Sequence, residues 1–273
     1  MPECITSREN ARIKYACRLA GSAAQRKADG AFFAEGYKLC RDLARACAPL
    51  EVFYTQKALD KHPDLAAFGC PQYLIAPHVA EKLAGTVSGQ GVFALLHQPL
   101  PPQNALRPGG RYLALEGVQD PGNVGALLRS AAAFGYTAAI LSAGCADPFA
   151  PKTLRAGMGA VGALPVLQAE SLPDTLSALG RMGVTCLAAA LRGSRPLNEA
   201  GGPWPGGVCI LIGSEGQGLS DAAISACAAS VRIPISPAVE SLNAGVAGGV
   251  LLWHFRAEQE GDGALPPAAK ELP

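Results

Sequence analysis

The chain has 273 residues, of which 49% are hydrophobic, and 23 basic residues nearly balance 22 acidic ones to give a net charge of +1. This length provides a core for one large or two ordinary domains, and the small charge excludes a global field that attracts nucleic acid, so any such contact needs a local patch. Nine cysteines without a CxxC pair argue against disulfides and zinc, and no apolar run is long enough to span a membrane, so we expect a cytoplasmic protein without metal or membrane partner.

The first hundred residues show alternating helix and strand patterns, which predict a small α/β sandwich. Strands are expected at 31–34, 50–54, 72–75 and 92–96, with helices at 7–19, 37–46 and 77–83. Basic residues with few acidic neighbours gather around the first helix, which is typical either of an RNA-binding patch or of a solvated helix face. These residues are Arg8, Arg12, Lys14, Arg18, Arg26 and Lys27.

A proline-rich stretch, QPLPPQNALRPGG, is interpreted as a linker to a second region. There, apolar strands alternate with helices, which predicts a mainly parallel sheet covered on both faces. Strands are expected at 112–115, 138–141, 185–190, 208–212 and 230–233, and helices at 124–134, 151–156, 172–179, 222–228 and 242–255. The predicted division is a domain at 1–98, a linker at 99–110, a domain at 111–260 and a disordered tail at 261–273.

Ligands of parallel sheets bind beyond the carboxyl ends of strands, where this chain has loops rich in glycine and polar residues. In the first loop, EGVQDPGNVGALLR, a tight turn precedes Asn123, which either caps the following helix or belongs to a site. Arg129 interrupts an apolar helix face where alanine or leucine would be buried better, so it is a candidate functional residue.

The second loop, IGSEGQGL, follows a buried strand, and its glycines free backbone groups to contact a ligand, with Glu215 as its only charge. It is not a P-loop, and no strand leads into GxGxxG, which excludes the usual triphosphate and dinucleotide sites. In the third segment, IPISPAVESLNAGVAGGVLLWH, Ser241 is expected as a helix N-cap and Asn243 is a polar residue near the helix start. The small residues after Asn243 allow a flat ligand to approach closely, so we expect a cofactor here.

Together, the segments EGVQDPGNVGALLRSAAAFG, LIGSEGQGLS and VRIPISPAVESLNAGVAGGVLLWHF resemble the signature motifs of the SpoU (TrmH-type) RNA 2'-O-ribose methyltransferases of the SPOUT superfamily. The resemblance extends from residue 112 to about 256. The segment NARIKYACRLAGSAAQRKADGAFFAEGYKLCRDL is similar to the substrate-binding domain of these enzymes, which resembles kink-turn-binding ribosomal proteins. The resemblance implies a C-terminal trefoil knot that binds S-adenosylmethionine, a homodimer, and a reaction that requires no metal.

The resemblance also implies site residues. The family holds its cofactor largely through backbone groups, which here implies Leu187, Ala189, Ile212, Gly213, Gly216, Ile233 and Leu242. The catalytic positions correspond to Asn123, Arg129, Glu215, Ser241 and Asn243. Lys152 and Arg155, in a segment that keeps several family residues, join the expected RNA-binding residues.

The family arginine, which corresponds to Arg129, is usually assigned to activating the ribose 2'-hydroxyl. A guanidinium stays protonated and accepts a proton poorly, so we interpret Arg129 as a clamp that stabilises the developing alkoxide. The general base stays open between phosphate, water and a perturbed site. We expect methylation of ribosomal RNA, with transfer RNA as the alternative substrate and a non-catalytic RNA-binding protein as the alternative function.

Overall fold

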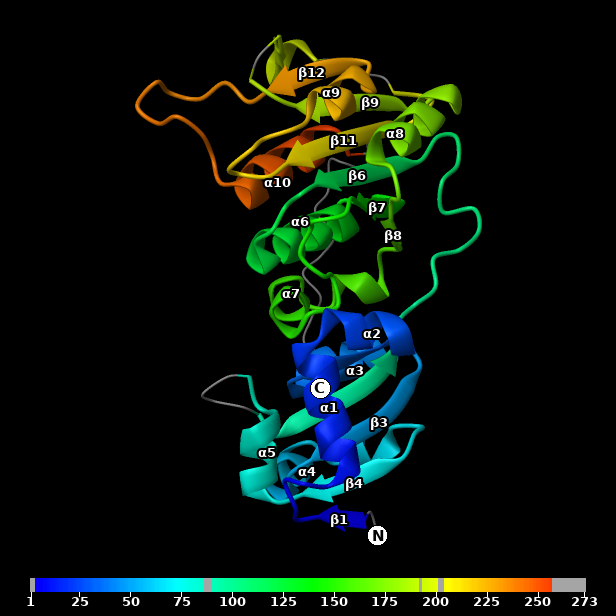
Figure 1. The fold of residues 1–273 in the computed structure, drawn as a ribbon, viewed down its shortest axis with the longest axis vertical. Helices are drawn as coiled ribbons and strands as arrows, with labels where there is room; N and C mark the ends of the chain where they lie inside the picture. The colour runs from blue at the N-terminus through cyan, green and yellow to red at the C-terminus, as the bar shows by residue number, and fades with distance from the viewer. Residues whose placement is uncertain (1–2, 86–89, 192, 201–203, 257–273) are drawn as a thin grey trace, which may run out of the picture.

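The computed structural model describes residues 3–85, 90–191, 193–200 and 204–256. Two sheets lie at opposite ends of the long axis of the molecule, the N-terminal one at one end and the larger C-terminal one at the other (Figure 1). The expected tail at 261–273 lies outside the described residues. Within the described ranges, no helix is both long enough and apolar enough to cross a membrane.

The N-terminal sheet has five strands in the order β1-β4-β3-β5-β2 and mixes parallel with antiparallel pairs. Its strands are β1 (Glu3–Ile5), β2 (Ala31–Glu35), β3 (Pro49–Tyr54), β4 (Gln72–Ile75) and β5 (Val92–His97). Its helices are α1 (Ala11–Gly21), α2 (Ala23–Asp29), α3 (Tyr37–Ala44), α4 (Gln56–Lys61), the 3-10 turn η1 (Pro63–Ala67) and α5 (Pro77–Leu83). The expected strands are confirmed. Strand β1 and helix α4 were not predicted, because segments of three and six residues are too short to show a periodic hydrophobic pattern.

The expected helix at 7–19 starts later and is followed by a second helix. Asn10 caps α1 by accepting a hydrogen bond from the N–H of Arg12, and Ser22 caps α2 by accepting one from the N–H of Gln25. An N-cap residue leaves the helical region of backbone dihedrals, and Ser22 has φ −124° and ψ 114°. This break gives α2, which carries Arg26, a direction of its own.

The C-terminal sheet has seven strands in the order β10-β12-β9-β11-β6-β7-β8, and all its pairs are parallel. Its strands are β6 (Arg111–Glu116), β7 (Ala138–Leu141), β8 (Val166–Gln168), β9 (Thr185–Ala189), β10 (Arg195–Pro196), β11 (Val208–Gly213) and β12 (Ala229–Arg232). The helices are α6 (Pro121–Ala133), α7 (Pro151–Ala156), α8 (Leu172–Arg181), α9 (Asp221–Ser225) and α10 (Ala244–His254), with 3-10 turns η2 (Ala160–Gly162) and η3 (Leu197–Glu199).

Helices cover both faces of the C-terminal sheet, which explains why its central strands are continuously apolar. Residues 208–212 of β11 are all buried. One face packs against α6 and α10 through Leu127 and Leu251, and the other against α8 and α9 through Leu176 and Ala223 (Figure 1). The predicted mainly parallel, doubly covered sheet is therefore confirmed. Strand pairing does not define how the C-terminal segment threads, so the trefoil knot stays a prediction.

The two domains share a continuous apolar core. The ring of Phe32 in β2 lies 5.2 Å from that of Phe149, which precedes α7. Gly159, which follows α7, packs against Leu39 and Leu43 of α3, and a Cβ at Gly159 would lie 3.0 Å from Leu39 Cδ1. The N-terminal domain is thus packed directly on the C-terminal domain.

The expected linker follows an irregular path that is fixed on the C-terminal domain. Ala105 is buried, and the hydroxyl of Tyr112 both accepts from the N–H of Arg107 at 2.8 Å and donates to its carbonyl at 2.9 Å. The N–H of Gly109 donates to the carbonyl of Gly206 at 2.9 Å. The connection therefore holds its course through hydrogen bonds at its C-terminal end.

Helix α6 approaches α7 closely at Gly125. A Cβ at this position would lie 2.6 Å from the carbonyl oxygen of Thr153 and 2.6 Å from the Cβ of Ala156. Such distances leave no room for a methyl group between the helices, so the absence of a side chain at Gly125 sets their separation.

We expect Gly125→Ala to lower the free energy of unfolding by about 1–3 kcal/mol, because the methyl group would force the backbones of α6 and α7 apart. Gly180→Ala, in α8, is the matched control. No atom lies within 4 Å of its added Cβ, and alanine is favoured over glycine in a helix by about 1 kcal/mol. Urea unfolding followed by circular dichroism measures both variants. If Gly125→Ala were as stable as the unmodified protein, the tight packing at Gly125 would be contradicted.

Candidate functional site

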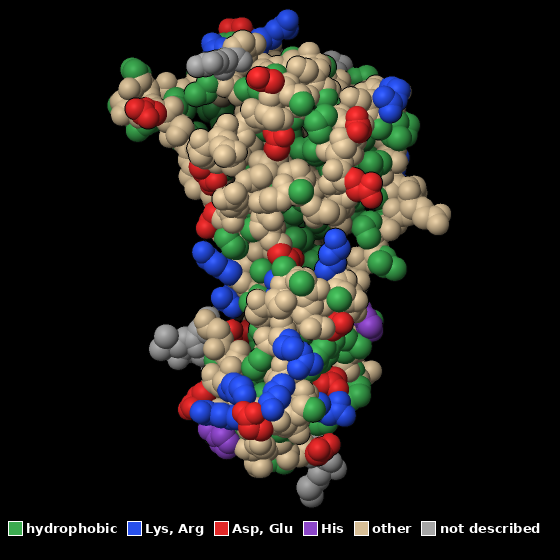
Figure 2. Space-filling model, in the orientation of Figure 1, with side chains coloured by type: hydrophobic (Ala, Val, Ile, Leu, Met, Phe, Trp, Pro, Cys, Tyr) green, Lys and Arg blue, Asp and Glu red, His purple; other side chains and the backbone are tan. Residues whose placement is uncertain are grey.

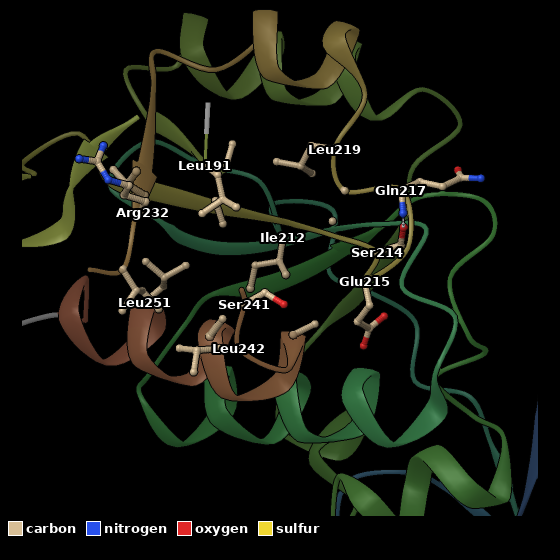
Figure 3. A pocket seen from close by; sticks show the side chains of 18 of the residues that line it. Leu191, Ile212, Ser214, Glu215, Gln217, Leu219, Arg232, Ser241, Leu242 and Leu251 are labelled. Carbon is tan, nitrogen blue, oxygen red and sulfur yellow. Dashed lines mark hydrogen bonds between the residues drawn. The ribbon is translucent and has the colours of Figure 1, made fainter. Parts of the chain in front are cut away.

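A cavity of about 730 Å³ opens at the carboxyl ends of three neighbouring parallel strands, β12, β9 and β11 (Figure 3). The ends of these strands and the segments that follow them form its walls, with lining residues within 231–235, 189–191 and 212–219 respectively. The start and one face of α10 close the cavity from the other side. The position is the one at which parallel sheets bind ligands.

The cavity is lined mainly by apolar side chains, with three polar residues of one loop on one side and Arg232 on the opposite side. Ile212 of β11 and Leu251 of α10 line the apolar part. Figure 3 shows Ser214, Glu215 and Gln217 together on the other side, in the loop after β11. The volume of the cavity falls within the range of about 300–1,000 Å³ that is usual for small-molecule sites.

The loop after β11 forms a tight turn that is held at both ends. A Cβ at Gly213 would lie 2.4 Å from the carbonyl oxygen of Gly218, and Ser214 pairs with Gly218 in an isolated β-bridge. Beyond the turn, the carboxylate of Glu116 accepts from the N–H of Ser220 at 2.9 Å and from its hydroxyl at 2.7 Å. The backbone that lines the cavity is therefore fixed. Glu116 was not predicted from the sequence, although it ends a strand beside a glycine-rich loop.

Asn243 caps α10. Its side-chain oxygen accepts from the N–H groups of Gly245 at 2.9 Å and Val246 at 3.2 Å, and the helix begins at the residue between Asn243 and Gly245. The prediction of Ser241 as the N-cap is wrong, because a cap oxygen must reach the second or third N–H of the helix and Ser241 lies two residues too early. Ser241 is exposed and lines the cavity with Leu242.

The side chain of Asn123 joins the first motif loop to the second, because its amide donates to the carboxylate of Glu215. Asn123 is not a helix cap. Helix α6 begins earlier, at Pro121, and Asp120 caps it by accepting from the N–H of Asn123 at 2.9 Å. This hydrogen bond, and then the nearby charge of Lys152, lower the pKa of Asp120.

Arg129 lies outside the cavity, with its side chain exposed in the middle of α6. Within the part of the chain that the structure describes, it forms no hydrogen bond or ion pair. The expectation that it interrupts a buried face is wrong. The buried face of α6 follows the helical spacing of Val124, Leu127, Leu128 and Ala131, and Arg129 falls on the solvent side.

Most of the residues predicted to hold a cofactor line the cavity, namely Ala189, Ile212, Gly213, Ile233 and Leu242. Two do not. Leu187 is buried inside β9 at the register position of Ile210, and Gly216 is exposed with no atom within 4 Å of its Cβ position. Leu187 therefore lies too early in β9 to reach the cavity at the carboxyl end of the strand, and Gly216 is an exposed loop residue that does not line the cavity although its neighbours Glu215 and Gln217 do.

Other lining residues were not predicted from the sequence. They are Leu191, Ser214, Gln217, Gly218, Leu219, Asp221, Ile224, Val231, Arg232, Ile235, Ala244, Ala247 and Leu251. Three of them, Ala244, Ala247 and Leu251, are spaced i, i+3 and i+7 on one face of α10, a signal that the sequence contains. Among the described residues, no group of three His, Cys, Asp or Glu is placed to hold a metal ion.

Comparison with known families identifies the family to which the domain with this cavity belongs. Residues 110–253, more than half of the chain, match the SpoU rRNA Methylase family. The chain belongs to this family. Residues 10–94 match the MRM3-like substrate binding domain. The predicted family is therefore confirmed, together with the α/β fold class of two domains.

Similar SpoU proteins extend over nearly the whole chain. A Synechocystis sp. protein named as an uncharacterized tRNA/rRNA methyltransferase is 36% identical over 264 residues, 93% of this chain and 94% of the relative. The 23S rRNA (guanosine(2553)-2'-O)-methyltransferase RlmP of Bacillus subtilis is 28% identical over 252 residues, 92% of this chain and 98% of RlmP. Among solved structures, the AdoMet-bound rRNA methyltransferase from Sinorhizobium meliloti matches with a TM-score of 0.82 and 28% identity, over 93% of this chain and 97% of that one.

The basic residues at the start of this SpoU protein are mostly paired. Arg8, Arg12 and Lys14 each form an ion pair with a glutamate of the same domain. Figure 2 shows basic and acidic side chains intermixed over this face of the N-terminal domain. Arg18 lies over a tyrosine ring, 5.6 Å from its centroid, and Lys27 is exposed; neither has an ion-pair partner among the described residues. Arg18 and Lys27 therefore stay the freest of the predicted RNA contacts.

Two predicted RNA-binding residues lie between the domains instead. Arg26 is only 4% exposed and forms an ion pair with Asp147, so the prediction that it contacts RNA is corrected. Arg155 lies 3.5 Å from the buried carboxylate of Glu35 and is one-third exposed. Lys152, with a side chain that is 65% exposed, lies 3.5 Å from the carboxylate of Asp120 at the start of α6.

We expect Asn243→Ala to destabilise the SpoU domain by about 1 kcal/mol, because two N–H groups at the start of α10 lose their acceptor. Asn243→Asp keeps an acceptor oxygen, and we expect it to stay within about 0.5 kcal/mol of the unmodified protein. Thermal unfolding followed by circular dichroism provides the measurement. If Asn243→Asp lost as much stability as Asn243→Ala, the cap would not be the contribution of this residue.

Proposed function

We propose that this chain is an S-adenosylmethionine-dependent methyltransferase that acts on the ribose 2'-hydroxyl of ribosomal RNA. The observation that carries the proposal is the convergence of the three SpoU motifs. The loop after β11 and the segment that leads into α10 line one cavity, and the loop before α6 is bonded to it by the hydrogen bond from Asn123 to Glu215. The similarity to RlmP over almost the full chain, and the match to an MRM3-like substrate binding domain, support ribosomal RNA as the substrate.

The cavity suits S-adenosylmethionine in size and in lining. Ile212 and Leu251 offer an apolar surface for a flat ring, and Gly213 and Leu242 line the cavity with backbone groups that can form hydrogen bonds to a ligand. S-adenosylmethionine supplies a methyl group that is already activated on a sulfonium. The AdoMet bound to the S. meliloti relative supports the same cofactor for this chain.

Asn123, Glu215, Ser241 and Asn243 are assigned to positioning at the polar end of the cavity. The hydrogen bond between Asn123 and Glu215 ties α6 to the loop after β11. Asn243 fixes the start of α10, and Ser241 is exposed on the cavity wall. Rigid support of this kind keeps reacting groups within the narrow range of geometries that a methyl transfer requires.

Arg129 is assigned to holding the target nucleotide and stabilising the negative charge that develops on the 2'-oxygen. Its guanidinium stays protonated, which suits it for this electrostatic role and not for proton removal. Because Arg129 is exposed and lies outside the cavity of its own chain, we assign it to the cavity of a second copy of the chain in a homodimer.

An apolar face of α10 is the proposed dimer surface. Val246, Val250 and Trp253 follow one another at helical spacing and are 55%, 39% and 52% exposed. Trp253 packs edge-on against Phe134, at the C-cap of α6, with ring centroids 5.5 Å apart. The face therefore adjoins the helix that carries Arg129, which favours a second copy of this chain as its partner.

We further assign residues 1–98 to RNA binding and 111–260 to methyl transfer, with 99–110 as the connection. Arg18, Lys27 and Lys152 are the proposed phosphate contacts. Arg18 and Lys27 are exposed without an ion-pair partner among the described residues, and the side chain of Lys152 is 65% exposed although it pairs with Asp120. A cytoplasmic location suits the nine cysteines, all of which are free thiols.

An in vitro assay with S-adenosylmethionine carrying a labelled methyl group tests the proposed function. Transcripts of 23S rRNA and of tRNA are incubated separately with the protein, and the site is mapped by resistance to alkaline hydrolysis. We expect label in rRNA at a linkage that resists hydrolysis. Label in tRNA alone would move the substrate to that class, and label in neither RNA while the cofactor binds would favour a non-catalytic RNA-binding protein.

We expect Arg129→Ala to lower the rate of methyl transfer by about 100- to 1,000-fold while the affinity for S-adenosylmethionine stays within about two-fold, because the residue touches the reacting oxygen and not the cofactor. Arg181→Ala, at an exposed arginine of α8, is the control and should retain full activity. Transfer rates and calorimetry measure the two effects. Equal loss of both in Arg129→Ala would indicate a role in folding.

We expect Val250→Glu to convert the dimer into a monomer, because a charge would be buried in the apolar face of α10. Met182→Glu, at an exposed methionine after α8, is the control and should leave the assembly intact. Sedimentation velocity measures both.

Mixing Arg129→Ala with Ala247→Phe, which fills the cavity, should restore roughly one quarter of the activity, because about half of the dimers are mixed and each has one intact cavity that meets an intact arginine. No recovery would place Arg129 in the cavity of its own chain.

A further inference from the structure

We propose that Arg26 and Asp147 form a positioning contact that holds the substrate-binding domain at a fixed distance and angle from the cavity, and that methyl transfer depends on it. This inference rests on the proposed function. Nothing in the sequence pattern distinguishes Arg26 from its solvent-exposed basic neighbours, yet it alone among them is buried.

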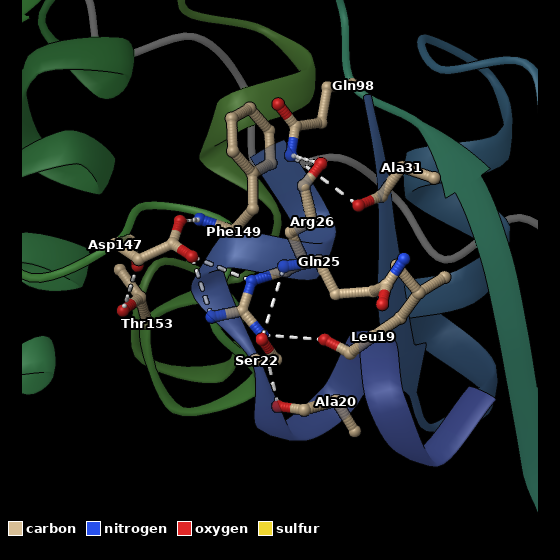
Figure 4. Close-up of polar contacts among 10 residues, drawn as sticks. All are labelled: Leu19, Ala20, Ser22, Gln25, Arg26, Ala31, Gln98, Asp147, Phe149 and Thr153. Carbon is tan, nitrogen blue, oxygen red and sulfur yellow. Dashed lines mark hydrogen bonds and ion pairs between the residues drawn. The ribbon is translucent and has the colours of Figure 1, made fainter. Parts of the chain in front are cut away.

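The guanidinium of Arg26 connects the two domains by directional bonds (Figure 4). Its Nε donates to Oδ2 of Asp147 at 2.7 Å, and Nη2 lies 2.6 Å from the same oxygen. Its Nη1 donates to the carbonyl oxygens of Leu19 at 2.6 Å and Ala20 at 3.1 Å. One side chain therefore joins the end of α1, the helix α2 and the C-terminal domain.

The carboxylate of Asp147 is held as firmly as its partner. Its Oδ1 accepts from the N–H of Phe149 at 2.8 Å, and its backbone carbonyl accepts from the hydroxyl of Thr153 at 2.8 Å. Thr153 is itself buried in α7. The carboxylate is thus fixed by the loop that leads into α7 and has little freedom to follow Arg26 if the domains move.

A second ion pair between the domains has the opposite polarity. Glu35 of the N-terminal domain lies 3.5 Å from Arg155 of α7, and its carboxylate also accepts from the N–H of Gly85 at 3.0 Å. Each domain therefore contributes one cation and one anion to the interface. A slide or a rotation of one domain against the other would separate both pairs.

The ion pairs add a directional constraint to the apolar contacts between the domains. Apolar contacts such as that of Phe32 with Phe149 are not directional and tolerate sliding. A buried guanidinium that loses its carboxylate is left charged without compensation, which is strongly unfavourable. The arrangement that keeps Arg26 against Asp147 both retains the apolar contacts and compensates the buried charge.

The contact reaches the cavity through two packed helices. Thr153, which is bonded to Asp147, presents its carbonyl to Gly125 of α6 at a distance that admits no side chain. Helix α6 carries both Asn123, which binds Glu215 at the cavity, and Arg129. RNA held by the N-terminal domain is therefore presented at a set spacing to the helix that bears the proposed catalytic arginine.

The test combines a distance measurement with kinetics. Spin labels are introduced as noncanonical amino acids at the exposed positions Lys61 and Arg181, because nine native cysteines preclude thiol labelling. Dilution with unlabelled protein isolates distances within one chain. The variants are Arg26→Gln and Asp147→Asn, of which the second keeps an acceptor for the N–H of Phe149. Arg45→Gln is the control, since it breaks an exposed pair within one domain.

We expect the distance distribution to broaden in Arg26→Gln and Asp147→Asn, and single-turnover transfer at saturating rRNA to slow by about 10- to 100-fold, because small misplacements of reacting groups are costly. Affinities for S-adenosylmethionine and for rRNA should stay within about two-fold, which a general loss of folding would not permit. Arg26→Lys should recover part of the rate, and Arg45→Gln should match the unmodified protein in every measurement.

An unchanged distribution in both variants would overturn the proposal, as would a broadened distribution with an unchanged rate. A parallel loss of cofactor affinity would also overturn it, because the pair would then support folding of the cavity. If the unmodified chain transfers no methyl group to RNA, the proposed function fails, whereas the distance distributions still decide whether Arg26 and Asp147 fix the domains.

Discussion

The close packing of α10 against β11 and α6 at Gly248 is the constraint on which the cavity depends. A Cβ at Gly248 would lie 2.1 Å from Cδ2 of Leu127 and 2.6 Å from Cδ1 of Ile212. Because α10 comes this close, its first turns face the loops that leave β9 and β11, and the space between them is the cavity. Glycine costs a helix about 1 kcal/mol relative to alanine, and here the missing side chain is what permits the approach.

Much of this architecture could be predicted from the sequence, because a strand buried on both faces is a continuous apolar run, as at 208–212. Helix starts were harder. Asp120 and Asn123 are both good caps, and so are Ser241 and Asn243, so residue type alone leaves the first turn uncertain by two or three residues. The difference matters for function: freed from capping, Asn123 binds Glu215, while Asn243 is committed to α10.

The site was predictable where it follows local motifs and not where it depends on contacts between distant segments. Gly213 and Leu242 lie in motifs and line the cavity, whereas Glu116 fixes the loop after β11 from a strand 104 residues away. Arg26 is the sharper case. It stands in a basic segment, so its charge suggested RNA, but the carboxylate it meets is that of Asp147, 121 residues later. The pattern of charges along the sequence does not reveal which distant residue pairs with a given side chain.

Helix α6 is the element in which these constraints meet. It packs on α7 through Gly125, and through α7 it is connected to the ion pair that holds the N-terminal domain. At its other end, Phe134 packs against Trp253 of α10, beside the proposed dimer surface. Its first turn carries Asn123, which binds Glu215 at the cavity, and Arg129 is exposed between Gly125 and Phe134. In the proposed homodimer, this one helix fixes a polar residue at its own cavity and carries the arginine assigned to the partner's cavity, so displacement of either neighbouring helix would alter the geometry of methyl transfer.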